Sequence, residues 1–311
     1  MLSEQIIQAI GKHIPTDRIL LNESMAAHTT FRVGGPADCL ILVENREELE
    51  NLLSLLRKTE SPFFLLGNGS NLLVGDKGYD GIVIKLTGDF QSIRLGEMKA
   101  SDGNSSLRAG AAVTLAALAR KAMELGLTGL EFASGIPGTL GGGLVMNAGA
   151  YDGELGEIIT YVEVLNESGE VMRLDHDTME FGYRTSAIKK RPFIALEAEI
   201  QLPSGNPKEI QERMEELARK RKEKQPLEYP SAGSTFKRPE GNFAGKLIMD
   251  AGLRGFSIGG AQVSEKHCGF VVNKGNATAA DIKEVIEEVR ERVDTRFGVM
   301  LEPEVIMLGK F

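Results

Sequence analysis

Two glycine-rich segments carry the residues best suited to hold a phosphate-bearing ligand. In the longer one, SGIPGTLGGGLVMNAGAY at 134–151, six of eighteen residues are glycine, against 36 of 311 in the whole chain. Glycine removes the Cβ that would block close approach and accepts positive φ, so successive N–H groups can turn toward one concave site. The interleaved Ile136, Leu140 and Val145 are untypical of a flexible linker. We interpret the run as a ligand-binding loop, with a tightly packed structural turn as the alternative.

The second segment, GNGSN at 67–71, follows an apolar stretch and offers backbone amides together with one hydroxyl and two side-chain amides. It matches neither the G-x-G-x-x-G of a Rossmann fold nor the G-K-[ST] of a P-loop. Alone it is equally typical of a tight turn between strands. Two such segments on one framework suit a dinucleotide, and FAD fits. The predicted cofactor contacts are Gly67, Asn68, Gly69, Ser70, Asn71, Ser134, Gly135, Ile136, Gly138, Thr139, Gly142, Gly143, Asn147, Ala148 and Gly149.

Composition narrows the class of protein. The chain is 42% hydrophobic with a net charge of −8 and a pI near 5.3, so it can bury a sizeable core and has no general basic field for nucleic acid. No stretch approaches the roughly 18 apolar residues of a membrane span, and the N-terminus lacks secretory-signal features. We expect a cytoplasmic protein with neither a nucleic-acid nor a membrane partner. The two cysteines and four histidines are scattered, so no metal site is predicted.

The elements that must position these segments follow from periodicity and capping residues. Leucines repeat at helical spacing after Asn45, and Thr114 precedes a second apolar face that Gly126 closes. Strict alternation over 194–202 predicts a strand with one solvated face, in one sheet with strands at 161–165 and 170–174. Further strands are predicted at 62–66 and 81–86.

A boundary is predicted at LPSGNP, 202–207, where turn residues precede a charged helix that begins at Pro207 and ends near Gln225. A second amphipathic helix is predicted over 279–297, packed on a sheet built partly from 269–273.

Six segments occur in one order along the chain: GNGSNLLV, IPGTLGGGLVMNAGAY, FGYRTS, YPSAGSTFKRP, GGAQVSEKH and LEPEV. Together they closely resemble the UDP-N-acetylenolpyruvoylglucosamine reductase (MurB) family of peptidoglycan synthesis, over essentially the whole chain. The spacing from Arg184 to Ser234 leaves little room for the substrate-capping tyrosine loop of one subgroup, so the chain resembles the shorter subgroup.

The resemblance implies an α+β fold. It consists of a PCMH-type FAD-binding domain, as in vanillyl-alcohol oxidase, in two α/β subdomains, followed by a C-terminal α+β substrate-binding domain. We expect the FAD-binding region at 1–204, with subdomains of about 1–86 and 87–204. The substrate-binding domain would follow at 205–300, and 301–311 would return as a strand toward the flavin.

The activity that the resemblance implies is reduction of UDP-N-acetylglucosamine-enolpyruvate to UDP-N-acetylmuramate, with FAD as cofactor and NADPH as hydride-donating cosubstrate. In this family NADPH reduces the flavin and leaves, and the nucleotide sugar then uses the same site. This accounts for the lack of a second dinucleotide fingerprint. A monomer or weak dimer is expected.

The implied chemistry names three catalytic residues. Hydride addition to the methylene carbon leaves negative charge beside the substrate carboxylate, so the site needs a cation, an acid and a proton donor. By resemblance these are Arg184, Glu304 and Ser234. From the residues alone, a surface ion pair, an edge-strand carboxylate and a turn serine are the alternatives.

Lys224 and Lys246 are the expected phosphate or carboxylate partners of the nucleotide sugar, with Arg221 and Gln262 as weaker choices. Tyr229 offers a hydroxyl or a stacking face, or serves as a loop anchor. The chain departs from the family pattern at Arg238, where asparagine is frequent, and at Ile306, where arginine is common.

Two other functions stay open at this point. One is a different FAD-dependent oxidase or dehydrogenase of the same fold. The other is a non-catalytic nucleotide-sugar-binding protein, in which Arg184, Ser234 and Glu304 would lie apart.

Overall fold

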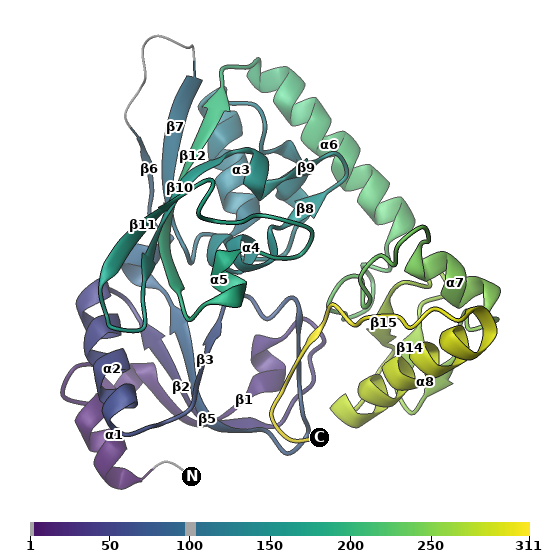
Figure 1. The fold of residues 1–311 in the computed structure, drawn as a ribbon, viewed down its shortest axis with the longest axis horizontal. Helices are drawn as coiled ribbons and strands as arrows, with labels where there is room; N and C mark the ends of the chain where they lie inside the picture. The colour runs from purple at the N-terminus through teal and green to yellow at the C-terminus, as the bar shows by residue number, and fades with distance from the viewer. Residues whose placement is uncertain (1–2, 97–103) are drawn as a thin grey trace.

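The computed structural model describes residues 3–96 and 104–311, which form two sheet-based subdomains and a C-terminal unit beside them (Figure 1). The first subdomain has a sheet of order β1-β2-β5-β3, in which β1 is antiparallel to β2 while β2, β5 and β3 run parallel. Its elements are α1 (Glu4–Ile10), β1 (Ile19–Ser24), β2 (Pro36–Val43), α2 (Arg46–Lys58), β3 (Phe63–Leu66) and β5 (Tyr79–Leu86).

Helix α2 forms where leucine spacing and capping predict it. The Asn45 side chain accepts a hydrogen bond from the Glu48 amide, and the repeating leucines from Leu49 to Leu56 are buried against the sheet. A polar N-cap and an apolar stripe with helical period are sufficient local signals. The predicted helix is confirmed.

The second subdomain is an antiparallel sheet of order β11-β10-β12-β7-β6. Its strands are β6 (Ile93–Leu95), β7 (Asn104–Gly110), β10 (Ile159–Leu165), β11 (Val171–Asp175) and β12 (Ile194–Pro203). Its helices are α3 (Leu115–Glu124), α4 (Leu140–Met146) and α5 (Ala187–Lys190). The helix capped by Thr114 is confirmed as α3.

The solvated face predicted for β12 is wrong at the middle of the strand. Because β12 is central in the sheet, consecutive residues from Ala195 to Ala198 are buried on both faces. The outward carboxylates are paired: Glu197 lies 2.6 Å from the Arg94 guanidinium and Glu199 accepts a 2.8 Å hydrogen bond from Arg108. The predicted water-facing row is therefore an ion-pair layer.

The glycine run predicted as a loop is partly helical. The short helix η4 (Glu131–Gly135) precedes α4, whose N-cap Thr139 accepts a hydrogen bond from the Gly142 amide. Helix α4 ends at Asn147, which has a φ of 44°, and the hairpin β8 (Gly149–Ala150) and β9 (Gly153–Glu154) follows. Burial of Leu140 and Leu144 offsets the poor helix propensity of the glycines.

The C-terminal unit packs α8 (Ala279–Phe297) on a sheet of β13 (Ser257–Ile258), β14 (Ala261–Val263) and β15 (Val271–Asn273), and α7 (Ala244–Asp250) packs against α8. Thr278 and Asp281 form a capping box at the start of α8, and Gly298 ends it with a φ of 64°. The helix predicted over 279–297 has these bounds.

The C-terminal unit is attached to the first subdomain at several points. Strand β16 (Ile306–Leu308) pairs in parallel with β4 (Leu72–Val74), and the buried Phe31 and Leu73 belong to the C-terminal core. The Asp76 carboxylate accepts hydrogen bonds of 2.8 Å from the Ala279 and Ala280 amides at the start of α8.

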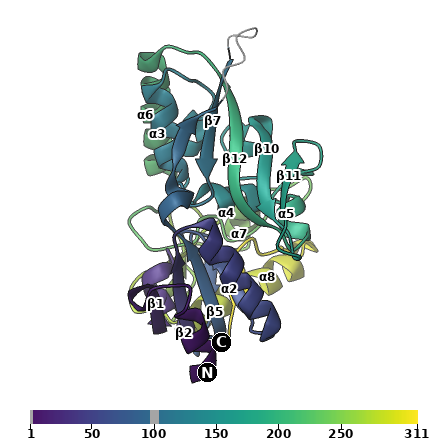
Figure 2. The same cartoon turned by 90° about the vertical axis from the view of Figure 1, so that its left-hand side faces the viewer.

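Helix α6 (Pro207–Lys224) spans from the second subdomain to the C-terminal unit (Figure 1) and lies alongside α3 (Figure 2). It packs on η4 and α3, with Ile210 and Leu217 buried. The domain bounds stay a prediction, and this packing leads us to propose a division after α6 rather than before it. No helix within residues 3–96 or 104–311 is long and apolar enough to cross a bilayer.

Candidate active site

The two glycine-rich segments lie against each other. The Asn68 side chain donates a 3.1 Å hydrogen bond to the Pro137 carbonyl, and a Cβ placed on Gly67 would lie 2.7 Å from Thr139 Oγ1. Two segments that are distant in sequence therefore form one surface, as a dinucleotide site requires.

This surface borders a cavity of about 570 Å³ between the two subdomains, within the size range of cofactor sites. The cavity is lined by β3, the loop that precedes α3, the first turn of α4, and 192–195 at the start of β12. Most of these residues are apolar, so the cavity suits flat rings as well as phosphates. Sequence reasoning missed this apolar lining, because β3 and β12 read only as sheet core.

The predicted cofactor contacts fall into two groups. Gly67, Asn68, Thr139 and Gly142 line the cavity. Others make contacts within the protein: Ser134 donates to the Glu131 carbonyl, buried Asn147 accepts from the Gly156 amide, and a Cβ on Gly69 would lie 2.0 Å from the His28 carbonyl oxygen. These residues shape the backbone of the cradle.

Gly142 provides the test of whether a ligand fits. If Gly142 carried a Cβ, the nearest atom it would meet is Thr139 Oγ1, at an ordinary contact distance of 3.5 Å. The fold therefore tolerates a side chain at Gly142, yet the position lines the cavity. The absence of a side chain at Gly142 therefore leaves room in the cavity for a bound group. The residues present fit FAD.

Arg184 and Glu304 form an ion pair near this cradle. Arg184 Nε lies 2.8 Å from Glu304 Oε1, and the two side chains are 24% and 13% exposed. Burial raises the pKa of the Glu304 carboxyl, and the positive charges of Arg184, Lys189 and Lys237 act against that rise. A carboxyl with a raised pKa beside a guanidinium can share a proton with a substrate oxygen.

A tight turn places Arg184. The amides of Gly182 and Thr185 each donate to the other residue's carbonyl, and Arg184 between them has a φ of 56°. Glycine or asparagine normally takes such a position. A strained arginine at this position is thus held by its surroundings, as is common at functional sites.

The backbone of Glu304 joins the other two predicted segments. Its amide donates a 2.8 Å hydrogen bond to the Thr235 carbonyl, and its own carbonyl accepts a 3.0 Å bond from the Asn71 side chain. Exposed Ser234 directly precedes Thr235, which is anchored to β15 through a 2.9 Å bond from the Val271 amide to its hydroxyl. The three predicted catalytic residues therefore converge on one region next to the cofactor cradle.

Two lysines that sequence reasoning missed belong to this centre. Lys189 on α5 donates a 2.9 Å hydrogen bond to the Arg184 carbonyl, and Lys237 forms an ion pair with Glu302. Burial, together with the nearby charge of Lys237, lowers the pKa of Lys189. In the sequence, the one sign of a role for either lysine is that Lys189 lies close to Arg184 and Lys237 lies close to Ser234.

The predicted substrate residues separate in the structure. Arg221 donates a hydrogen bond to the Gly135 carbonyl, so it contacts the glycine run itself, and burial lowers its pKa. Lys224 is exposed at the end of α6, and Lys246 on α7 pairs with Asp250.

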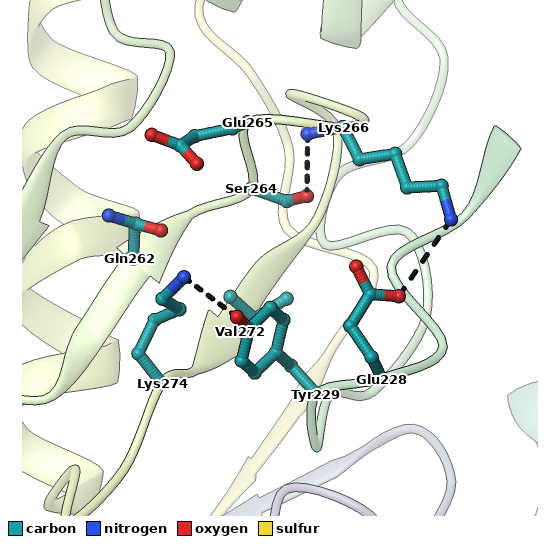
Figure 3. A pocket seen from close by; sticks show the side chains of 8 residues that line it. All are labelled: Glu228, Tyr229, Gln262, Ser264, Glu265, Lys266, Val272 and Lys274. Carbon is teal, nitrogen blue, oxygen red and sulfur yellow. Dashed lines mark hydrogen bonds and ion pairs between the residues drawn. The ribbon is translucent and has the colours of Figure 1, made fainter.

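Tyr229 and Gln262 both line a small pocket of about 130 Å³ (Figure 3). The Tyr229 hydroxyl accepts a 3.0 Å hydrogen bond from Lys274, whose ammonium also lies 4.2 Å from the tyrosine ring centroid. Lys266 and Glu228 form an ion pair of 3.8 Å on the opposite wall (Figure 3).

The departures from the family pattern are accommodated. The Arg238 amide donates a 3.0 Å hydrogen bond to the Tyr183 hydroxyl, and its guanidinium lies 4.1 Å from the Phe243 ring centroid. Ile306 lies in β16, where its amide donates to the Asn71 carbonyl. Arg238 thus connects the turn that bears Arg184 to the segment that follows Ser234.

Comparisons with known proteins agree with this arrangement. Residues 37–175 match the model of an FAD binding domain, and 225–308 match that of the UDP-N-acetylenolpyruvoylglucosamine reductase C-terminal domain. The chain is 48% identical to the reductase of that name from Caldanaerobacter subterraneus over 99% of this chain and 100% of the relative. It is 49% identical to that from Agathobacter rectalis over 100% of both.

Among solved structures, the UDP-N-acetylenolpyruvylglucosamine reductase of Thermus caldophilus matches with a TM-score of 0.78 and 38% identity. The match covers 93% of this chain and 98% of that one. The fold is thus the α+β architecture of a PCMH-type FAD-binding domain joined to a MurB C-terminal domain. With full-length relatives at this identity and a matching C-terminal domain, the chain belongs to the UDP-N-acetylenolpyruvoylglucosamine reductase family.

Proposed function

We propose that the centre formed by Arg184, Glu304 and Ser234 reduces the enolpyruvyl group of UDP-N-acetylglucosamine-enolpyruvate. The observation that carries this is the partly buried Arg184–Glu304 ion pair, connected through Asn71 to the cofactor cradle. A non-catalytic binding protein would have no use for a strained arginine paired with a partly buried carboxyl. The convergence of these residues argues against that alternative.

Family membership makes the chain an FAD-dependent oxidoreductase of peptidoglycan synthesis that uses NADPH as reductant. FAD bound there and reduced by NADPH would supply the hydride for the enolpyruvyl carbon. Gly67, Asn68, Thr139 and Gly142 line the cavity that would hold it, and the apolar side chains around them exclude water from the reacting region.

Arg184 binds the substrate carboxylate and stabilises the negative charge that develops on it. Its guanidinium is always charged and matches two carboxylate oxygens at once. Glu304 lies 2.8 Å away and burial raises the pKa of its carboxyl, so we assign it as the group that shares a proton with the same oxygens in the enol form. Ser234, on the segment beside Glu304, donates the proton that completes the product.

For the nucleotide sugar, we propose Lys224 and Arg221 as contacts near the end of α6, with Lys246, Tyr229 and Gln262 contributed by the C-terminal unit. Arg221, a weaker choice from the sequence, is ranked higher here because its guanidinium donates a hydrogen bond to the Gly135 carbonyl in the glycine run. A cytoplasmic location and a monomeric or weakly dimeric state are part of the same proposal, since the proposed cosubstrates are soluble nucleotides.

The deciding experiment separates the two half-reactions. The purified holoenzyme is reduced anaerobically with NADPH, and UDP-N-acetylglucosamine-enolpyruvate is then added while flavin absorbance is followed. We expect stoichiometric reoxidation of the flavin with formation of UDP-N-acetylmuramate. Reoxidation by oxygen but not by the sugar would overturn the proposal in favour of an oxidase of the same fold.

A further inference from the structure

Arg184 has a backbone conformation that its own residue type disfavours. Its φ of 56° lies in the left-handed region, where a side chain beyond glycine is sterically disfavoured. The turn between Gly182 and Thr185 has two backbone hydrogen bonds of its own, and the Asn147 side chain donates a 3.3 Å bond to the Gly182 carbonyl. These contacts hold residues on either side of Arg184, so a contact with Arg184 itself would fix the turn further.

Lys189 supplies such a contact. Its ammonium donates a 2.9 Å hydrogen bond to the carbonyl of Arg184 and lies 3.6 Å from the sulfur of Met146, the last residue of α4. In the same short helix region, buried Ser186 donates a 3.1 Å bond from its hydroxyl to the Val145 carbonyl. The turn is thus attached to the end of the helix whose start borders the cofactor cavity.

The charge of Lys189 also acts on Glu304. The cations that favour the ionised carboxylate are Arg184 from the turn, Lys189 from α5 and Lys237 from the segment after Ser234. Glu302 adds a negative charge that acts on Lys189 and pairs with Lys237. Removing Lys189 would leave one fewer positive charge to oppose the effect of burial, so the pKa of the Glu304 carboxyl should rise.

We propose that Lys189 is a positioning residue for the reaction: its ammonium holds the left-handed turn of Arg184 and so fixes the guanidinium against Glu304. The proposal rests on the roles proposed above for Arg184 and Glu304. It assigns Lys189 no contact with substrate, and it requires both the positive charge and the hydrogen-bond donor of its side chain.

Lys189→Met tests the proposal, because methionine keeps the length and apolar stem but loses the charge and the donor. Lys190→Met is the matched control: Lys190 is the next residue of α5 and its ammonium pairs with Glu180, at 2.9 Å. Holoenzyme reduced with NADPH is mixed with the enolpyruvyl sugar. We expect Lys189→Met to slow flavin reoxidation by about 10- to 100-fold, Lys190→Met to leave it unchanged, and Lys189→Arg to restore most of the rate.

A second readout does not depend on turnover. The protonated carboxyl of Glu304 is followed by infrared difference spectroscopy as a function of pH, with the band assigned by its loss in Glu304→Gln. Loss of a nearby cation raises the pKa of a carboxyl, so the band should persist to higher pH in Lys189→Met and not in Lys190→Met. Lys189→Gln replaces the methionine variant should that not fold.

The outcomes distinguish the positioning role of Lys189 from the proposed function of the site. An unchanged reoxidation rate and titration in Lys189→Met, in an enzyme that still reacts with the sugar, would overturn the positioning role alone. Equal losses in both half-reactions with an unchanged titration would mean a merely structural lysine, and would also overturn it. Failure of the wild-type enzyme to react with the sugar would instead sink the proposed function.

Discussion

The cofactor cavity and the charged centre beside it are built on opposite principles. The cavity owes its shape to side chains that are absent, as at Gly142, and to a lining of mostly apolar residues. The centre owes its function to side chains that are present under strain or burial, namely Arg184 with a φ of 56° and Glu304 with a raised pKa. In our proposal the cavity leaves room for the cofactor, whereas the charged side chains of the centre act on the substrate. Substitutions should therefore separate binding from chemistry.

The largest expected effect is in the charged centre. Ser234→Ala removes the proposed proton donor, and loss of a general acid typically lowers a rate by about 10²- to 10⁴-fold. Reduction of the flavin by NADPH should keep its wild-type rate, because that step needs no proton from Ser234. Stopped-flow measurement of both half-reactions checks this, with Ser231→Ala as the control, and equal losses in both steps would contradict the role.

Arg184→Gly should lose activity, yet it should be more stable than Arg184→Ala. Reaction with the sugar should fall by at least about 10²-fold with the guanidinium gone, while glycine accepts the left-handed turn without strain. Arg184→Ala should be equally inactive but keep the strain. Urea unfolding of the two variants should differ by about 1 kcal/mol in favour of glycine, and a difference of zero would show that the turn is not strained.

Gly142→Ala should weaken cofactor binding without harming the fold. The added Cβ has room among protein atoms but enters the lining of the cavity, so the FAD dissociation constant should rise by about tenfold or more, the equivalent of ~1.4 kcal/mol. Stability of the apoprotein should stay level or rise, since alanine favours helix.

Gly143→Ala is the matched opposite on the same helix. Its Cβ would lie 2.8 Å from Leu155 Cδ1, so apoprotein stability should fall. Fluorescence titration with FAD and thermal unfolding of both apoproteins distinguish the two. If Gly142→Ala bound FAD normally, the glycine at that position would be no part of the cradle.

The smallest effect concerns pH and stability. Because the folded protein holds the Glu304 proton above the ordinary carboxyl pKa, the folded state binds more protons than the unfolded state in the window above 4.5. Stability contributed by this group is thus present at low pH and is lost as pH rises through the folded value. Urea unfolding across that window should show a decline that Glu304→Gln lacks, and a parallel pair of curves would contradict the raised pKa.

The sequence reveals the local elements well. Helices α2, α3 and α8 were predictable because each combines a polar N-cap with an apolar stripe, signals that lie within one segment. The middle of β12 was not, because alternation cannot show that a strand is central in its sheet or that Arg94 covers Glu197. Packing in the third dimension decided that strand.

The site divides in the same way. Glycine density pointed to the cradle from the residues themselves, whereas Arg184, Ser234 and Glu304 were reached only through the family resemblance. Neither glycine density nor the resemblance pointed to Lys189. Its contact with the Arg184 carbonyl depends on a left-handed turn, and no local sequence pattern predicts a positive φ at an arginine. The separation of Lys246 from the Tyr229 pocket is likewise a matter of tertiary arrangement.

The hydrogen bond from Asn71 ends on the backbone carbonyl of Glu304, not on its carboxylate. Any amino acid at position 304 can offer that carbonyl, so this hydrogen bond fixes the backbone at position 304 whichever side chain is present. The loop that borders the cofactor is thereby insulated from changes in the reactive group. A lineage, or a protein engineer, could exchange the acid for another functional group and test new reductions on an unaltered frame.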